Sequence, residues 1–166
     1  MQVPTRRADK RPRIKVDSHL TVEKFTELKN NLERLTKVVR PRLAEEVKRL
    51  STTGDYSENA GYQAAKGKLR GLNARILEIE DLIRRAVIIE PNVNNDVVGL
   101  GNLVTVESGG KQKQFRILGS TETNPVAGVI SHISPLGSAL IDRHTGEVVR
   151  IMLPGGEREY RIIKIE

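Results

Sequence analysis

Two carboxylates three positions apart, Asp55 and Glu58, are the side chains of this chain best suited to chemistry. They lie in residues 54–60, which interrupt two long helical patterns and are therefore expected at the tip of a helical hairpin. A carboxylate pair can help to bind a hard cation such as Mg²⁺, which is typically held by one or two carboxylates plus substrate phosphates. The tip alone cannot complete such a site, so a partner would have to supply the other ligands.

The same spacing also has a purely structural interpretation. Asp-x-x-Glu at a helix start is close to a capping box, in which Asp55 would accept the backbone N–H of Glu58 and Glu58 would reach back to that of Asp55. Both carboxylates also suit the positive end of the helix dipole. Spacing alone favours capping, because such caps are common. The two roles are partly compatible, since a carboxylate has about four lone-pair sites.

A row of basic side chains follows the tip, with no acid among them before Glu78. Its members are Lys66, Lys68, Arg70 and Arg75. Like charges that share a helix face cost some helix stability, so an anionic partner such as RNA is one interpretation. The row has no interleaved aromatic side chains, which favours attraction to a phosphate backbone over base stacking. Solvated residues of good helix propensity explain the row equally well.

The three histidines, His19, His132 and His144, lie far apart in the sequence and lack the spacing of metal ligands. Ser57 has no histidine near it in the sequence, and the chain contains neither a nucleophile elbow nor a P-loop. We therefore expect no metal binding by the histidines and no self-contained catalytic centre.

The 166-residue chain carries a net charge of +7 that is confined to its first half. Residues 1–90 hold 20 Lys and Arg against 13 Asp and Glu, whereas residues 91–166 hold 8 of each kind. This asymmetry suggests that the first half works beside nucleic acid or an acidic protein surface, although a solvated helix face also explains it. The absence of Cys fits a reducing cytoplasm, and no apolar run is long enough to span a membrane. A soluble, cytoplasmic protein is expected.

The pattern of apolar residues predicts an α+β chain in three parts. Residues 1–17 lack apolar periodicity and are expected to form a flexible basic tail. In residues 18–90 the apolar positions alternate in steps of three and four, which predicts an antiparallel α-helical coiled-coil hairpin with helices at about 21–50 and 56–86. Thr21 is expected to cap the first helix, and Pro41 to kink it or remove one hydrogen bond.

The period changes to that of strands in residues 91–166. Strands are predicted at 103–107, 112–118, 128–133, 147–153 and 159–165, with Ser108, Gly109 and Gly110 as a hairpin turn. Ser134 as N-cap and Pro135 at the first helical position predict a short helix after the third strand. This part is expected to be a small antiparallel β-sheet domain with one short helix.

The tip and the second half together resemble the bacterial Gre transcript-cleavage factors, of the GreA/GreB type. In the first half the resemblance rests on Gly54-Asp55-x-Ser57-Glu58-Asn59-Ala60-x-Tyr62. In the second half it rests on Val129-Ile130-Ser131, on Ser134-Pro135-Leu136-Gly137-Ser138-Ala139-Leu140 and on Pro154-Gly155-Gly156-Glu157. The chain departs from the family pattern in its N-terminal tail, at Tyr56 and at Gly61.

The resemblance implies a transcription elongation factor that is not itself an enzyme. The hairpin would enter the secondary channel of bacterial RNA polymerase, and an FKBP-like C-terminal domain would dock at the rim of that channel. Asp55 and Glu58 would help to retain the second Mg²⁺ and so activate the polymerase's own endonuclease on backtracked RNA. That Mg²⁺ would be held jointly with the polymerase, with none bound stably by the free protein. The factor would act as a monomer beside the nascent RNA 3′ end, with the basic row in contact with RNA.

Three other functions are compatible with parts of this pattern. A factor on the same scaffold could inhibit the polymerase by occupying the channel without cleavage, although such relatives tend to carry additional tip acids. An FKBP-like domain also suggests a prolyl isomerase, but residues 91–166 offer only Phe115 and Tyr160 to line an aromatic pocket. A general coiled-coil nucleic-acid binder would leave the tip acids without a role.

Overall fold

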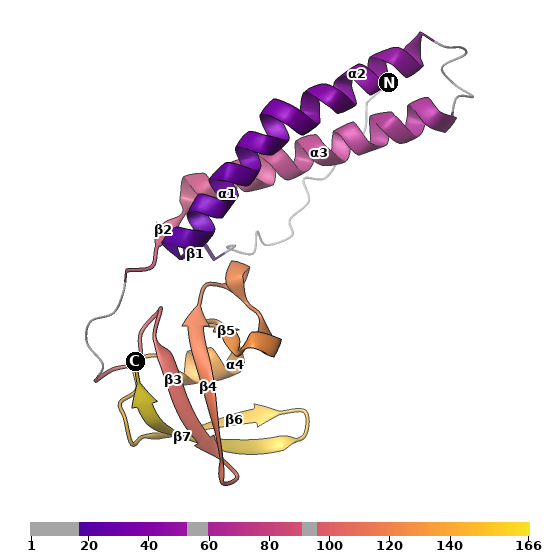
Figure 1. The fold of residues 1–166 in the computed structure, drawn as a ribbon. Coiled ribbons are helices and arrows are strands. Elements are labelled where there is room, and N and C mark those ends of the chain that lie inside the picture. Colours follow the sequence, from indigo (N-terminus) through magenta and orange to yellow (C-terminus); the bar gives the residue numbers. More distant parts are fainter. Residues whose placement is uncertain (1–16, 53–59, 91–95) are drawn as a thin grey trace, which may run out of the picture.

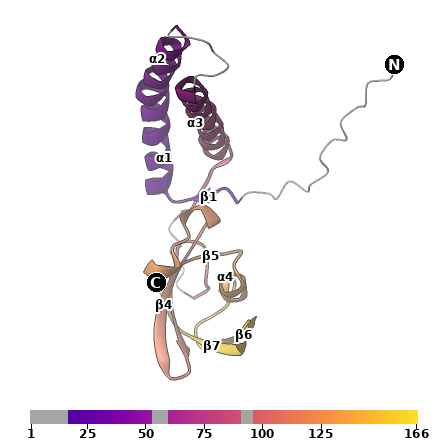
Figure 2. The ribbon, with the colours of Figure 1, turned by 90° about the vertical axis from the view of Figure 1, so that its right-hand side faces the viewer.

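A computed structural model describes residues 17–52, 60–90 and 96–166, which form a helical hairpin and a β-sheet domain (Figure 1). The predicted tail, apart from Asp17, and the predicted tip loop with Asp55 and Glu58 lie outside the described residues. The hairpin extends away from the sheet domain, and its two helices lie side by side in both views (Figures 1 and 2). The predicted α+β class and the order of its two halves are confirmed.

The first arm of the hairpin is one helical stretch made of α1 (Val22–Arg34), a π-helical turn (Leu35–Val39) and α2 (Arg40–Ser51). The predicted N-cap is confirmed, because the Thr21 hydroxyl accepts a hydrogen bond of 3.2 Å from the backbone N–H of Lys24. The π turn ends where the backbone N–H of Arg40 donates to the Leu35 carbonyl, five residues back. Pro41 has no N–H to donate, and the wider turn directly before it lets the helix continue beyond the proline.

The second arm is α3 (Ala60–Arg85), and the apolar core of the hairpin lies toward the base of the two arms. Leu28 and Leu35 of the first arm pack with Ile76 and Ile79 of α3, as the alternating apolar pattern predicts. No residue of α2 is buried, whereas Ala65 of α3, near the far end, is only 2% exposed. Burial along the predicted seam is therefore greatest in the half of the hairpin that faces the sheet domain, with Ala65 as the exception.

A two-residue parallel pair closes the base of the hairpin. β1 (His19–Leu20) pairs with β2 (Val87–Ile88), so the residues that enter the first arm are bonded to those that leave the second. The backbone N–H of Val87 donates to Ser18 at 2.9 Å, and that of Ile89 donates to Leu20 at 2.8 Å. Leu20 is fully buried beneath this pair. The sequence pattern did not predict the pair, because two residues are too few to show a strand period.

The second domain is a five-stranded sheet in the order β5-β4-β3-β7-β6. Its strands are β3 (Leu103–Ser108), β4 (Lys111–Leu118), β5 (Val129–Ser131), β6 (Val148–Leu153) and β7 (Gly156–Ile165). All five predicted strands are present, and Gly109 and Gly110 form the predicted turn with positive φ. The core of this domain contains Val104, Val106, Ile117, Leu140 and Ile162, all of them fully buried.

The sheet differs from the prediction at one edge, because β5 runs parallel to β4 and the sheet is mixed. The chain between them forms two 3-10 turns, Ser120–Glu122 and Pro125–Ala127, in place of a tight hairpin turn, and so returns in the same direction. Helix α4 (Pro135–Leu140) follows β5, and the Ser134 hydroxyl accepts from the backbone N–H of Gly137 at 3.1 Å, as predicted.

Burial predicts which residue of α3 stabilises the hairpin. Ile79 is 1% exposed and Leu77, two positions away on the same helix, is 64% exposed. Ile79→Ala should lower the free energy of unfolding by about 2–5 kcal/mol, because it leaves a cavity in the core. Leu77→Ala, the matched control, should change it by less than about 0.5 kcal/mol. Chemical denaturation followed by far-UV circular dichroism measures both, and equal losses would contradict this account of the hairpin core.

Candidate functional site

The basic row lies along α3 with all four side chains exposed. Arg75 pairs with Glu78 at 3.1 Å, so the acid that ends the row neutralises its last member. The ammonium group of Lys66 lies 5.8 Å from the centre of the Tyr62 ring. No ion pair between described residues involves Lys66, Lys68 or Arg70. Unlike Arg75, these three residues therefore carry charges that no described acidic side chain neutralises.

The two helix ends that flank Asp55 and Glu58 in the sequence are both described. α2 ends at Ser51 and α3 begins at Ala60, and both ends lie at the extremity of the hairpin remote from the sheet domain (Figure 1). The chain that joins them carries Asp55 and Glu58. Gly61, one of the departures from the family pattern, lies in the first turn of α3, where glycine costs up to about 1 kcal/mol of helix stability.

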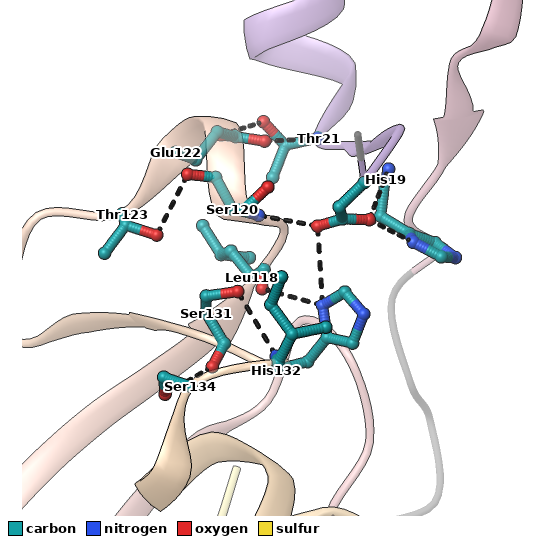
Figure 3. A network of polar contacts seen from close by, with 11 residues as sticks. His19, Thr21, Leu118, Ser120, Glu122, Thr123, Ser131, His132 and Ser134 are labelled. Atoms are coloured by element: carbon teal, nitrogen blue, oxygen red, sulfur yellow. Dashed lines mark hydrogen bonds and ion pairs between the residues drawn. The ribbon is translucent and has the colours of Figure 1, made fainter. Parts of the chain in front are cut away.

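At the opposite end, a set of polar residues joins the hairpin to the sheet domain (Figure 3). We call this set the junction network, and its members are Asp17, His19, Thr21, Ser120, Glu122 and His132. Glu122 accepts two hydrogen bonds from Thr21, one from its backbone N–H at 2.7 Å and one from its hydroxyl at 2.8 Å. The same Thr21 hydroxyl caps α1, so the Thr21 side chain links the start of the hairpin to the 3-10 turn after β4.

Asp17 makes the second connection of the junction network. Its carboxylate accepts a 2.6 Å hydrogen bond from the backbone N–H of Ser120. It also accepts from the backbone N–H of His19 at 3.1 Å and from His19 Nδ1 at 2.7 Å. The prediction that Asp17 belongs to a flexible tail is therefore wrong. Only 6% of its side chain is exposed, and it is bonded to Ser120 of the sheet domain, 103 positions away in the chain.

The Asp17 carboxyl remains ionised at neutral pH. Burial raises its pKa and is the largest single influence, but the hydrogen bonds from Ser120 and His19 and the electrostatic attraction of His132 together outweigh burial and lower the pKa below the ordinary 3.8. A buried charge of this kind is tolerated because several donors surround it.

The fold also brings together two histidines that are isolated in the sequence. His132 follows β5, and its Nδ1 lies 3.6 Å from Asp17 and 3.4 Å from the Leu118 carbonyl oxygen (Figure 3). The ring centres of His19 and His132 are 5.2 Å apart, with an edge-to-face arrangement. Sequence spacing could not reveal this cluster because its members belong to different domains. His144 lies elsewhere, with its Nδ1 3.1 Å from the Asp96 carbonyl oxygen.

Gly119 allows the two domains to approach this closely. A Cβ atom at this position would overlap the backbone carbonyl oxygen of His19 and would lie 3.1 Å from the Asp17 carboxylate. The carbonyl is part of the backbone, and the carboxylate is held by its hydrogen bonds from Ser120 and His19, so neither group can move away cheaply. The absence of a side chain at Gly119 is therefore a requirement of the docked junction.

The comparisons with known proteins agree with these two halves. Residues 18–88 match the family described as "Transcription elongation factor, N-terminal", and residues 93–166 match the family described as "Transcription elongation factor, GreA/GreB, C-term". This chain belongs to the GreA/GreB family of transcription elongation factors. Membership of the Gre family implies an interaction with RNA polymerase and a role in elongation, and its relatives are named transcription elongation factors.

Individual relatives cover nearly the whole Gre chain. Transcription elongation factor GreA of Clostridioides difficile is 39% identical over 149 residues, which are 88% of this chain and 94% of that protein. GreA of Thermotoga neapolitana is 36% identical over 148 residues, covering 88% of this chain and 95% of the relative. Among solved structures, GreA factor homolog 1 of Thermus thermophilus is 30% identical with a TM-score of 0.42, covering 89% of this chain and 97% of that one. Within the described ranges, no helix of this Gre factor is long and apolar enough to cross a membrane.

The junction network predicts the effect of a single methyl group. Gly119→Ala should separate Ser120 from Asp17 and loosen the docking of the domains, at a cost of about 1–3 kcal/mol. Hydrogen–deuterium exchange should become faster at the amides of Ser120 and Thr21 while the secondary structure stays intact. Gly155→Ala is the matched control, because a Cβ there meets nothing within 4 Å. Unchanged exchange in Gly119→Ala would show that the junction does not depend on this close approach.

Proposed function

We propose that this factor inserts its hairpin into the secondary channel of bacterial RNA polymerase and stimulates the polymerase's intrinsic, Mg²⁺-dependent cleavage of backtracked nascent RNA. Asp55 and Glu58 supply carboxylates to the shared metal site, and the sheet domain docks at the channel rim as a monomer. The observation that carries the proposal is the position of the carboxylate pair between α2 and α3, whose adjoining ends lie far from the sheet domain.

The chemistry of the pair requires a partner. Mg²⁺ prefers near-octahedral oxygen coordination and is usually bound by one or two carboxylates together with phosphate oxygens and water. Two tip carboxylates therefore suit a metal ion whose remaining ligands come from the polymerase and the RNA. In two-metal hydrolysis one ion activates water and the other stabilises the leaving oxygen, so retention of a weakly held second ion would raise the cleavage rate.

The exposed charges of α3 support the same orientation. Lys66, Lys68 and Arg70 lie in the first half of the helix, on the side of the hairpin that is remote from the junction network. Their positive charge would attract the phosphates of the extruded RNA segment. Arg75 lies closer to the base and is already paired with Glu78, so it contributes less to this attraction.

The tip pair gives the decisive test. Asp55→Asn and Glu58→Gln both retain side chains that cap helices well, but each removes a negative charge that a hard cation needs. Cleavage of RNA in a purified, backtracked polymerase complex should fall by about 10²-fold, the scale of one lost charge-stabilising group at an active site. Binding to the polymerase should persist, and excess Mg²⁺ should restore part of the cleavage.

The outcomes separate cleavage from inhibition. Shortened RNA with the wild-type factor supports the proposal, whereas blocked RNA synthesis without shortening would indicate a channel inhibitor on the same scaffold. An Asp55→Asn variant that supports cleavage at the wild-type rate under limiting Mg²⁺ would contradict the metal-ligand role and favour helix capping as the role of the pair.

The basic row predicts a change in salt dependence. Replacing Lys66, Lys68 and Arg70 by Gln should weaken crosslinking of the factor to the RNA 3′ segment in a backtracked polymerase complex that is saturated with the factor. The slope of log affinity against log salt should fall by about 2, because each lost contact to single-stranded RNA contributes about 0.7. Arg75→Gln should have the smallest effect.

A matched charge control uses three exposed residues of the sheet domain, Lys111, Lys113 and Lys164, also replaced by Gln. This variant loses the same charge but should crosslink to RNA as the wild type does. Equal losses in the two triple variants would assign the effect to net charge alone and the basic row to a solvated helix face.

A further inference from the structure

The Asp17, His19 and His132 cluster has no part in the function proposed above. Two of its members precede α1, whereas His132 belongs to the sheet domain. A carboxylate oxygen and one nitrogen from each ring all lie within 4.8 Å of one another. His19 Nδ1 lies 2.7 Å from Oδ1 of the Asp17 carboxylate, and His132 Nδ1 lies 3.6 Å from Oδ2 (Figure 3).

This donor set is selective in its chemistry. Two imidazole nitrogens and one carboxylate oxygen suit Zn²⁺ and neighbouring divalent transition metals, whereas Mg²⁺ prefers oxygen ligands alone. The Asp17 carboxylate is fixed by the backbone N–H groups of Ser120 and His19, as the ligands of metal sites are commonly held by a surrounding shell of hydrogen bonds.

We propose that Asp17, His19 and His132 form a binding site for a divalent transition-metal ion such as Zn²⁺ at the junction of the two domains. Zinc bonds of about 2.0–2.1 Å place tetrahedral ligand atoms about 3.4 Å apart. The 2.7 Å contact of His19 with Asp17 therefore needs to lengthen, and the separations of up to 4.8 Å within the cluster need to shorten, each by roughly 1 Å. The His19 side chain is 35% exposed and the His132 side chain 21% exposed, which leaves room for this adjustment and for a water molecule as fourth ligand.

Metal binding requires that each ring nitrogen that becomes a ligand carries no proton. Without metal, each Nδ1 faces an oxygen atom, the Asp17 carboxylate for His19 and both that carboxylate and the Leu118 carbonyl for His132. On binding, each ring would donate the Nδ1 lone pair to the metal and carry a proton at Nε2 only, and any further ring proton would pass to solvent. The ionised Asp17 carboxylate would offset one of the two positive charges of the ion.

A metal at this place would act on the arrangement of the domains. The site is complete only when the sheet domain is docked against the base of the hairpin, because His132 comes from one side and Asp17 and His19 from the other. An ion that binds only the docked form shifts the docking equilibrium toward it by mass action, about 100-fold when its free concentration is 100 times its dissociation constant. The occupied site would hold the hairpin in one orientation relative to the sheet domain.

The test uses the full-length chain and Zn²⁺ in isothermal titration calorimetry, with Co²⁺ as a spectroscopic substitute. One ion should bind per chain, and Co²⁺ should give the visible absorption of a tetrahedral nitrogen–oxygen site. His19→Asn and His132→Asn should each weaken binding by more than about tenfold, since even outer partners of metal ligands change affinity by about 10–100-fold. Excess Mg²⁺ should not displace the bound Zn²⁺.

Two controls separate this site from other metal-binding groups. His144→Asn removes the third histidine of the chain and should leave binding unchanged. The double variant Asp55→Asn with Glu58→Gln should also bind Zn²⁺ normally, so failure of the tip proposal and failure of this one are distinguishable. A wild-type chain without saturable binding of one ion, or a His132→Asn variant that binds as the wild type does, would show that the cluster is only a hydrogen-bonded contact.

A measurement on the unaltered protein covers the case in which a histidine variant does not fold. The chain has three histidines, so the ring protons of each can be resolved by NMR spectroscopy. Substoichiometric Co²⁺ should shift or broaden the signals of His19 and His132 and leave those of His144 nearly unchanged. Equal perturbation of all three rings, or of His144 alone, would overturn the proposal.

Discussion

The short hydrogen bond from the Ser120 backbone to the Asp17 carboxylate is the contact on which the arrangement of the two domains depends. A buried carboxylate is expensive to desolvate, and here the donors that offset this cost come from both domains. Separation of the domains would leave Asp17 without one of its backbone donors. Glu122 adds a second bidentate contact to Thr21 beside it, so the docked state is defined by direction-dependent bonds.

These polar bonds matter because, among the described residues, neither of the two apolar clusters spans both domains. Most buried apolar residues of the described chain fall into two clusters, one within the hairpin and its closing β1–β2 pair and one within the sheet domain. Each domain is therefore stabilised mainly by burial of its own apolar residues, and the junction network fixes the orientation of one domain relative to the other. An interface of this kind resembles a transient protein–protein contact, which is polar and can open without unfolding either side.

The sequence was informative wherever local periodicity or capping chemistry decides the structure. Leu28, Leu35, Ile76 and Ile79 follow the helical seam, and Thr21 and Ser134 both cap helices with their hydroxyl groups as predicted. The strand pattern likewise located all five strands of the sheet. In each case the residues that interact are close in the chain or repeat at a fixed interval.

The parts that escaped prediction depend on contacts between distant segments. The direction of β5 is decided by the course of the chain after Leu118, and the β1–β2 pair is too short to carry a period. Asp17 lies in a charged segment that resembles a tail, and only the position of Ser120 reveals its role. For the candidate site, the acid pair and the basic row were recognisable from residue types, but the pairing of Arg75 with Glu78 and the meeting of His19 with His132 required the fold.

The parallel β1–β2 pair has a mechanical consequence. It bonds the first residues of one arm to the residues that follow the other arm, so neither helix can slide along its neighbour without breaking these bonds. A rotation at the base is then transmitted to both arms together, and the hairpin turns as one unit. Because displacement at the end of a lever grows with its length, a small rotation at the base becomes a large sweep at the opposite end of α3.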